Sequence, residues 1–149
     1  MTLSNRSIVV LAFEGYQELE FWYPVLRARE EGAEVKVVGP GEGPCESHLG
    51  YPVLGDTVAA EVVSEDVDAL VVPGTVAGRP AISAEQVTLL RRLRAADVPI
   101  FASGSGAHLV RELVLDVDPD HVAADADALP SLFTRLRSVL HADLSHRSR

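Results

Sequence analysis

VPIFASGSGAHLV, residues Val98–Val110, carries the clearest structural pattern in the sequence. An apolar run from Pro99 to Ala102 ends in the turn Ser-Gly-Ser-Gly, and a helical pattern begins at Ala107. A buried strand that enters a helix through such a turn is typical of a nucleophile elbow, which holds one side chain at the carboxyl edge of a parallel sheet. The tip of an elbow has a strained, positive φ, so we assign it to Gly104, which adopts that conformation without steric cost. Glycine carries no nucleophile, so the sequence predicts an elbow without its usual reactive atom.

The bulk composition limits the class of protein and its partners. A chain of 149 residues with 47% hydrophobic and 23% charged residues predicts one soluble globular domain over residues 1–149. The formal net charge of -9 argues against nucleic acid and anionic membranes as partners, because both require basic patches. A single cysteine, Cys45, and the lack of a signal peptide or of a run of about 20 apolar residues predict a cytoplasmic protein. No His and Cys spacing fits a zinc site, so we expect no metal and no other cofactor.

Strand and helix patterns alternate along the chain. Strands are predicted at 8–12, 34–38, 68–72 and 99–102, and the continuous apolar run at 8–12 is typical of a strand buried on both faces. Glycines and prolines between 45 and 55 indicate an edge hairpin, and helical patterns occur at 17–31, at 84–96 after the N-cap Ser83, and from Pro130. In the first helix, Leu19, Trp22 and Leu26 are expected to face the core. This alternation predicts a doubly wound parallel sheet, in which ligands bind beyond the carboxyl ends of the strands.

Three segments at these strand ends carry a family resemblance. EGYQELEFWYP (14–24) is similar to an acidic segment ahead of a helical proline, and DALVVPGT (68–75) to an aspartate-led strand that ends in Pro-Gly-Gly. VPIFASGSGAH (98–108) is similar to a strand and elbow that carry a cysteine. In this order the segments resemble the ThiJ/PfpI superfamily, which includes intracellular proteases, glyoxalases, protein deglycases and isonitrile hydratases. The resemblance implies a flavodoxin-like α/β fold, with a doubly wound parallel sheet between two layers of helices.

The chain departs from the family pattern at two places. Gly104 stands where the family has cysteine, and Ala107 replaces the usual proline. After residue 115 the sequence is short, and we predict that it runs directly into the last helix. The family has one or two further strands there, so we expect a sheet that is truncated at its C-terminal side.

Glu20 is the best candidate for a functional group. The resemblance places it where the family keeps a buried, protonated carboxylate against the nucleophile. We therefore expect the Glu20 carboxyl beside Gly104, in a cleft walled by Tyr16, Trp22 or both. The alternative is an exposed helix glutamate among acidic neighbours.

The other candidates flank the elbow. Ser105 could act as a nucleophile only with an adjacent base, which the spacing does not reveal, and Ser103 could bind a ligand or local backbone. His121 follows the elbow at nearly the distance at which relatives place a catalytic histidine, although its polar setting also fits an exposed side chain. Backbone amides are expected to form an oxyanion hole and a nest for a carbonyl or carboxylate oxygen; the residues concerned are Gly74, Thr75, Gly104, Ser105 and Gly106. Cys45 lies in the hairpin, remote from the elbow, and is expected to be a bystander.

Two functions remain open on the sequence. In the first, the elbow holds a small molecule with a carbonyl or conjugated group, and Glu20 acts as an acid or base without covalent catalysis, in a hydrolase, lyase or hydratase reaction. In the second, the domain is an inactive pseudoenzyme that binds a ligand or a protein partner. A homodimer is left open in both cases.

Overall fold

The computed structural model describes residues 2–114 and 116–147, with side chains as far as residue 141. Five parallel strands form one sheet in the order β2-β1-β5-β6-β7. The strands are β1 (Ser7–Leu11), β2 (Glu34–Val38), β5 (Ala69–Val72), β6 (Ile100–Ser103) and β7 (Val122–Ala123). Counted along the parallel strands, this order is 2-1-3-4-5, which is the flavodoxin-like order. The predicted flavodoxin-like α/β fold is confirmed.

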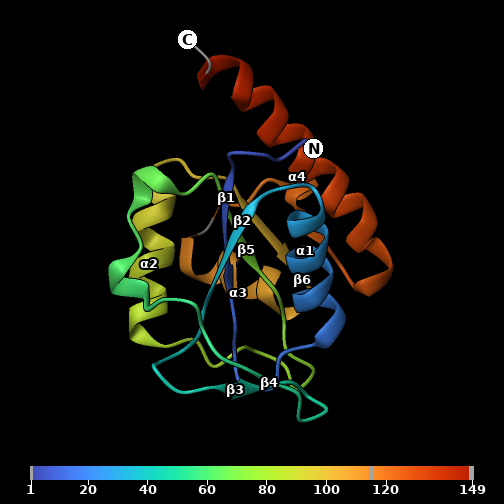
Figure 1. Cartoon of the computed structure of the whole chain (residues 1–149). Coiled ribbons are helices and arrows are strands. Elements are labelled where there is room, and N and C mark those ends of the chain that lie inside the picture. The colour runs from blue at the N-terminus through green and yellow to red at the C-terminus, as the bar shows by residue number, and fades with distance from the viewer. Residues whose placement is uncertain (1, 115, 148–149) are drawn as a thin grey trace.

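Helices cover both faces of the sheet (Figure 1). On one face lie α1 (Glu18–Glu30) and α4 (Leu129–Arg147), and on the other lie α2 (Ala84–Ala95) and α3 (Ser105–Val114). The central strands β5 and β6 are buried at every position because their apolar side chains pack against both helical layers. Short 3₁₀ helices occupy Ala59–Glu61, Ser64–Asp66, Pro119–His121 and Ala126–Ala128.

The predicted edge hairpin consists of β3 (Cys45–Glu46) and β4 (Pro52–Val53), which pair antiparallel. It lies at the carboxyl end of the sheet, at the bottom of Figure 1. Helix α2 begins as predicted: Ser83 and Gln86 form a capping box. The Gln86 side chain is fully buried and also donates to the carbonyl oxygens of Ala12 (2.9 Å) and Val38 (3.1 Å), which ties α2 to the ends of β1 and β2.

Two predictions about the elements were wrong. The chain does not run directly from α3 to the last helix, because Val122 and Ala123 pair with Ala102 and Ser103 as the fifth strand. A strand of two residues has too few positions to produce an apolar period, so the sequence did not reveal it. In α1, Leu19 and Leu26 are 58% and 52% exposed and point away from the core.

The buried stripe of α1 consists instead of Phe21, Val25 and Ala28, together with Glu20 and Pro24. These positions recur at three- and four-residue steps on the opposite side of the helix from Leu19. Both sides of α1 carry apolar residues, so periodicity alone could not decide which side meets the sheet.

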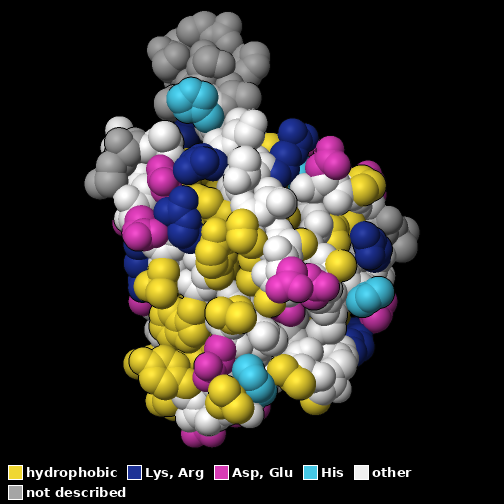
Figure 2. All heavy atoms as spheres, turned by 90° about the vertical axis from the view of Figure 1, so that its right-hand side faces the viewer, with side chains coloured by type: hydrophobic (Ala, Val, Ile, Leu, Met, Phe, Trp, Pro, Cys, Tyr) yellow, Lys and Arg dark blue, Asp and Glu magenta, His cyan; other side chains and the backbone are white. Residues whose placement is uncertain are grey.

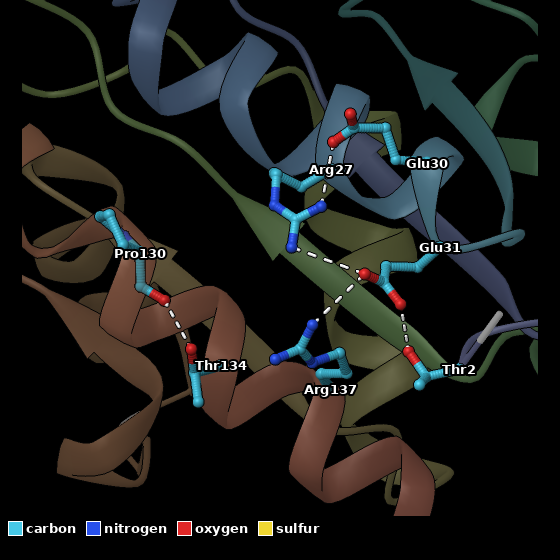
Figure 3. A network of polar contacts seen from close by, with 7 residues as sticks. All are labelled: Thr2, Arg27, Glu30, Glu31, Pro130, Thr134 and Arg137. Atoms are coloured by element: carbon cyan, nitrogen blue, oxygen red, sulfur yellow. Dashed lines mark hydrogen bonds and ion pairs between the residues drawn. The ribbon is translucent and has the colours of Figure 1, made fainter.

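A polar network joins the end of α1 to α4 (Figure 3). The Glu31 carboxylate is reached by Arg137 at 3.3 Å and by Arg27 at 3.5 Å, and it also accepts a hydrogen bond from Thr2. The network therefore fixes α4 and the beginning of the chain against the C-terminal end of α1.

Candidate functional site

The loop after β1 is held against the loop after β5. The Gln17 amide donates to the Gly74 carbonyl (3.0 Å), and the Gln17 side chain caps α1 by accepting from the Glu20 amide (2.7 Å). These loops leave neighbouring strands at the point where the strand order reverses, which is where ligands bind in such sheets. Gln17 therefore sets where α1 begins and brings Glu20 to the ligand-binding edge.

The Glu20 carboxyl group is buried at the ligand-binding edge of the sheet. The residue is only 8% exposed, and its Oε1 accepts hydrogen bonds from the Gly74 amide (2.8 Å) and the Ser103 hydroxyl (3.0 Å). Its Oε2 forms no hydrogen bond with any residue that the structure describes. One carboxyl oxygen is thus fixed by the protein, and the other has no protein donor among the described residues.

Gly104 is the tip of the elbow, with φ of 53°, as predicted. A Cβ atom on Gly104 would lie 2.7 Å from Glu20 Oε2 and 2.8 Å from Glu20 Oε1, closer than real Cβ contacts. The Glu20 carboxyl therefore occupies the space that a side chain at the tip would need. It also lies beside the N-terminus of α3, which begins at Ser105.

Ser105 and Thr75 bond to one another beside the tip. The Thr75 amide donates to Ser105 Oγ (2.9 Å), and the Ser105 hydroxyl contacts the Thr75 carbonyl oxygen at 3.2 Å. The Thr75 amide, which follows Gly74 and was expected to contribute to the oxyanion hole, thus already donates to Ser105, and the Gly74 amide donates to Glu20. Ser105 has no base among its hydrogen-bond partners in the described residues.

Gly74 and Gly106 allow the two loops to approach closely. A Cβ on Gly74 would lie 2.7 Å from Ser105 Oγ, and one on Gly106 would overlap the backbone oxygens of Val72 and Pro73. Any larger residue at either position would separate α3 from the end of β5.

Tyr16 does not wall a cleft. Its side chain is fully buried, its ring packs 4.8 Å from that of Phe21, and its hydroxyl donates to the Tyr51 carbonyl oxygen (2.9 Å). Tyr16 therefore anchors the hairpin segment under the candidate site, and a ligand at the surface cannot reach its side chain. Trp22 is partly buried and packs against Tyr51, with ring centroids 5.9 Å apart.

His121 is not brought to the elbow. It precedes β7, its ring stacks on Phe101 with centroids 4.3 Å apart, and Nε2 lies 3.7 Å from Asp118. It lines an open groove of about 410 Å³ together with Val98–Ile100, which enter β6 from the amino end, opposite to Gly104. Burial lowers the pKa of His121, partly offset by Asp118. The distance along the sequence matched the family pattern, but the short strand β7 places the imidazole elsewhere.

Cys45 lies in the hairpin and is buried. Burial, reinforced by the nearby Glu14, raises its pKa to about 11, so the thiol is protonated at neutral pH.

No group of three His, Cys, Asp or Glu side chains among the described residues could hold a metal ion. Within the described parts of the chain, no helix is long and apolar enough to cross a membrane.

The structure thus brings together Glu20, Gly74, Thr75, Ser103, Gly104, Ser105 and Gly106. Sequence reasoning missed the bond between Ser103 and Glu20 and the role of Gln17. Glutamine is not among the preferred N-cap residues, so the sequence carried no local signal for it. The partner of Ser103 lies 83 residues away, beyond any local pattern.

Sequence comparisons match this chain to a protein family and to several relatives. Residues 6–117 match the model of the DJ-1/PfpI family. Deglycase TK1284 of Thermococcus kodakarensis is 39% identical over 67 residues, covering 45% of this chain and 40% of its own length. Deglycase PH1704 of Pyrococcus horikoshii is 28% identical over 104 residues, covering 69% of this chain and 63% of its own length. The matched regions therefore span less than two thirds of these relatives.

Solved structures share the fold at lower sequence identity. Oxidized DJ-1 of Toxoplasma gondii superposes with a TM-score of 0.77 at 18% identity and covers 91% of each chain. DJ-1beta of Drosophila melanogaster gives a TM-score of 0.74 at 20% identity, covering 91% of this chain and 90% of its own. With the family model matching residues 6–117 and the elbow in its expected place, this chain belongs to the DJ-1/PfpI family.

Proposed function

We propose that this chain binds a small carbonyl or conjugated compound at the elbow, and that Glu20 exchanges a proton with it without a covalent intermediate. The observation that carries the proposal is the position of the Glu20 carboxyl, which takes the space of a side chain at the tip. Glycine at the tip leaves no nucleophilic atom there, and the Ser105 hydroxyl is engaged by Thr75. The carboxyl is then the reactive group nearest to a ligand at the tip.

The two oxygens of the Glu20 carboxyl are suited to different tasks. Oε1 receives two hydrogen bonds, which fix the orientation of the carboxyl group. Oε2 faces the tip without a donor among the described residues, so a substrate hydroxyl, amine or activated C–H could exchange a proton with it. The relatives named deglycases support an enzymatic activity, although they are matched over only part of their length.

A second candidate function is an inactive module that binds a ligand or a partner. One observation favours it: the amides of Gly74 and Thr75 already donate to protein groups. A substrate oxyanion would have to displace Ser105 or Glu20 from them, which weakens any stabilisation of a negative transition state.

Turnover and binding together separate the two candidates. Small aldehydes, isonitriles and Michael acceptors would be incubated with the wild type and Glu20→Gln, with product formation followed by NMR and binding by calorimetry. The proposal predicts that at least one compound is converted and that Glu20→Gln still binds it but converts it far more slowly. Binding without conversion in the wild type would favour the inactive module. Covalent adducts under turnover, detected by intact mass spectrometry, would exclude the non-covalent mechanism.

A further inference from the structure

Ser103 carries the polar side chain of β6, the strand that leads into the elbow. The other residues of this strand, Ile100, Phe101 and Ala102, are apolar, and Ser103 itself is only 1% exposed. A buried hydroxyl group costs free energy unless it forms a hydrogen bond. Among the described residues, the Ser103 hydroxyl forms one such bond, to Glu20 Oε1 at 3.0 Å. The contact with Glu20 therefore accounts for a polar residue at this buried position.

The turn after β6 is held without the Ser103 side chain. The backbone of Ser103 pairs with Ala123 of β7, and the Gly104 amide donates to the Ala123 carbonyl oxygen at 2.9 Å. These bonds involve backbone atoms only, so they remain when the hydroxyl is removed. A role of the hydroxyl toward Glu20 can thus be tested without opening the elbow.

The two donors to Glu20 saturate one of its carboxyl oxygens. A carboxylate oxygen offers two lone pairs. The Gly74 amide, in the loop after β5, takes one lone pair of Oε1 at 2.8 Å, and the Ser103 hydroxyl, at the end of β6, takes the other. Oε2 accepts no hydrogen bond from the described residues. A proton on Oε1 would displace one of the two donors, whereas a proton on Oε2 leaves both bonds intact.

Distance from the tip does not distinguish the two oxygens. A Cβ atom on Gly104 would lie 2.7 Å from Glu20 Oε2 and 2.8 Å from Oε1. Exposed acidic side chains occur on the side of the molecule that α1 and α4 cover (Figure 2), and water can donate to both of their oxygens. Of the acidic residues in α1, only Glu20 is buried. At this carboxyl the protein donors therefore decide which oxygen is free to carry a proton.

We propose that Ser103 is a positioning residue for the reaction: its hydroxyl occupies the second lone pair of Glu20 Oε1 and so confines proton exchange to Oε2. This inference rests on the proposed acid–base function of Glu20. The substrate proton passes to Oε2, the electron pair of the broken bond stays on the substrate, and Oε2 later returns the proton. Ser103 keeps its own proton throughout and, because it is buried, acts through Glu20 rather than on the substrate.

Removing the hydroxyl frees a lone pair on Oε1. A proton bound there is held between Gly74 and β6 and is not presented to the ligand, so part of the protein is in an unproductive arrangement. The carboxyl group also keeps only one of its two donors, so its orientation is less fixed. Both effects act on the proton-transfer step and leave ligand binding unchanged, so we expect kcat to fall while KM stays constant.

Turnover of serine variants tests this role. On a compound that the wild type converts, Ser103→Ala should lower kcat at least about tenfold with KM within about twofold. Ser103→Thr keeps a hydroxyl and should restore most of kcat. Ser47→Ala is the matched control, because Ser47 is also buried and its hydroxyl also donates to an α1 glutamate, Glu18 at 2.5 Å, but in the hairpin segment. It should lower the Tm and leave kcat unchanged.

Thermal unfolding tests the same contact without a substrate. Gly104→Ala displaces the Glu20 carboxyl from both donors in the wild type, but in the Ser103→Ala background one of these bonds is already absent. Gly104→Ala should therefore lower the Tm less in the Ser103→Ala background than in the wild type. An equal decrease in both backgrounds would overturn the proposal, because the hydroxyl would not hold the carboxyl group.

The kinetic outcomes separate a failure of this proposal from a failure of the proposed function. Wild-type kcat in Ser103→Ala together with loss of turnover in Glu20→Gln would overturn only the role of Ser103. A fall of kcat in Ser103→Ala that a folded Ser103→Thr does not restore would do the same. A wild type that converts no compound, or a Glu20→Gln variant with wild-type kcat, would overturn the acid–base function and with it the role of Ser103.

Discussion

Replacing Gly104 with alanine tests whether the Glu20 carboxyl fills the space of the tip side chain. The substitution introduces two separate costs. A non-glycine residue at φ of 53° costs about 1 kcal/mol. The new Cβ would also lie 2.7–2.8 Å from both carboxyl oxygens, so Glu20 must move and weaken its bonds to Gly74 and Ser103. A hydrogen bond contributes about 0.5–1.5 kcal/mol net, and the loss of two together with the backbone cost gives a total of about 2–4 kcal/mol.

Urea unfolding of a set of variants separates the two costs. Gly15 has φ of 77°, and a Cβ added there would have nothing within 4 Å, so Gly15→Ala should show only the backbone cost of about 1 kcal/mol. In a Glu20→Ala background the cost of Gly104→Ala should fall to the same value, because no carboxyl remains to be displaced. For a chain of this length, the full effect corresponds to a decrease in Tm of about 5–15 °C. Equal costs at Gly104 and Gly15, or an unchanged cost of Gly104→Ala in the Glu20→Ala background, would show that the Glu20 carboxyl does not fill the space of the tip side chain.

Three further variants test the remaining assignments. Because burial raises the Cys45 pKa to about 11, iodoacetamide at neutral pH should modify the thiol only in unfolded protein. Cys45→Ser should keep full turnover. Inactivation of the folded protein by mild alkylation would instead indicate that the Cys45 thiol takes part in the reaction. Burial lowers the His121 pKa below its ordinary 6.5, so the unfolded state binds more protons just below that pH and the free energy of unfolding should fall there as pH decreases. His121→Gln should remove this fall, and an unchanged pH profile would contradict the assignment. Ser105→Ala should lower turnover less than about tenfold if the hydroxyl only bonds to Thr75, whereas complete loss would identify Ser105 as the nucleophile.

The sheet could be predicted from the sequence because its strands are specified locally. The runs that became β1, β5 and β6 are continuously apolar, and a strand buried on both faces requires that pattern whatever its neighbours are. The elbow was predictable for a similar reason, since positive φ at the tip limits the turn to glycine or a strained residue. The fifth strand, β7, was not predictable, because it has only two residues and depends on pairing with Ala102 and Ser103.

The site was less predictable because its contacts join distant segments. The Glu20 carboxyl meets Gly74 and Ser103, which lie 54 and 83 residues further along the chain. Family resemblance supplied the position of Glu20 but not the hydroxyl that orients it. Tyr16 was predicted as a wall, and its complete burial follows from the hairpin segment that folds over it. The exposure of Leu19 was also not predictable from the local sequence, because contacts at the sheet edge determine which side of α1 is buried.

The turnover of Glu20→Gln shows whether proton exchange by the Glu20 carboxyl is the chemistry at the elbow, because glutamine keeps the shape of the carboxyl group but cannot exchange a proton. On a compound that the wild type converts, kcat of Glu20→Gln should fall by about 100-fold or more while KM, the Tm and ligand binding stay nearly unchanged. Retention of wild-type kcat in Glu20→Gln would contradict the claim that the Glu20 carboxyl carries the chemistry at the elbow.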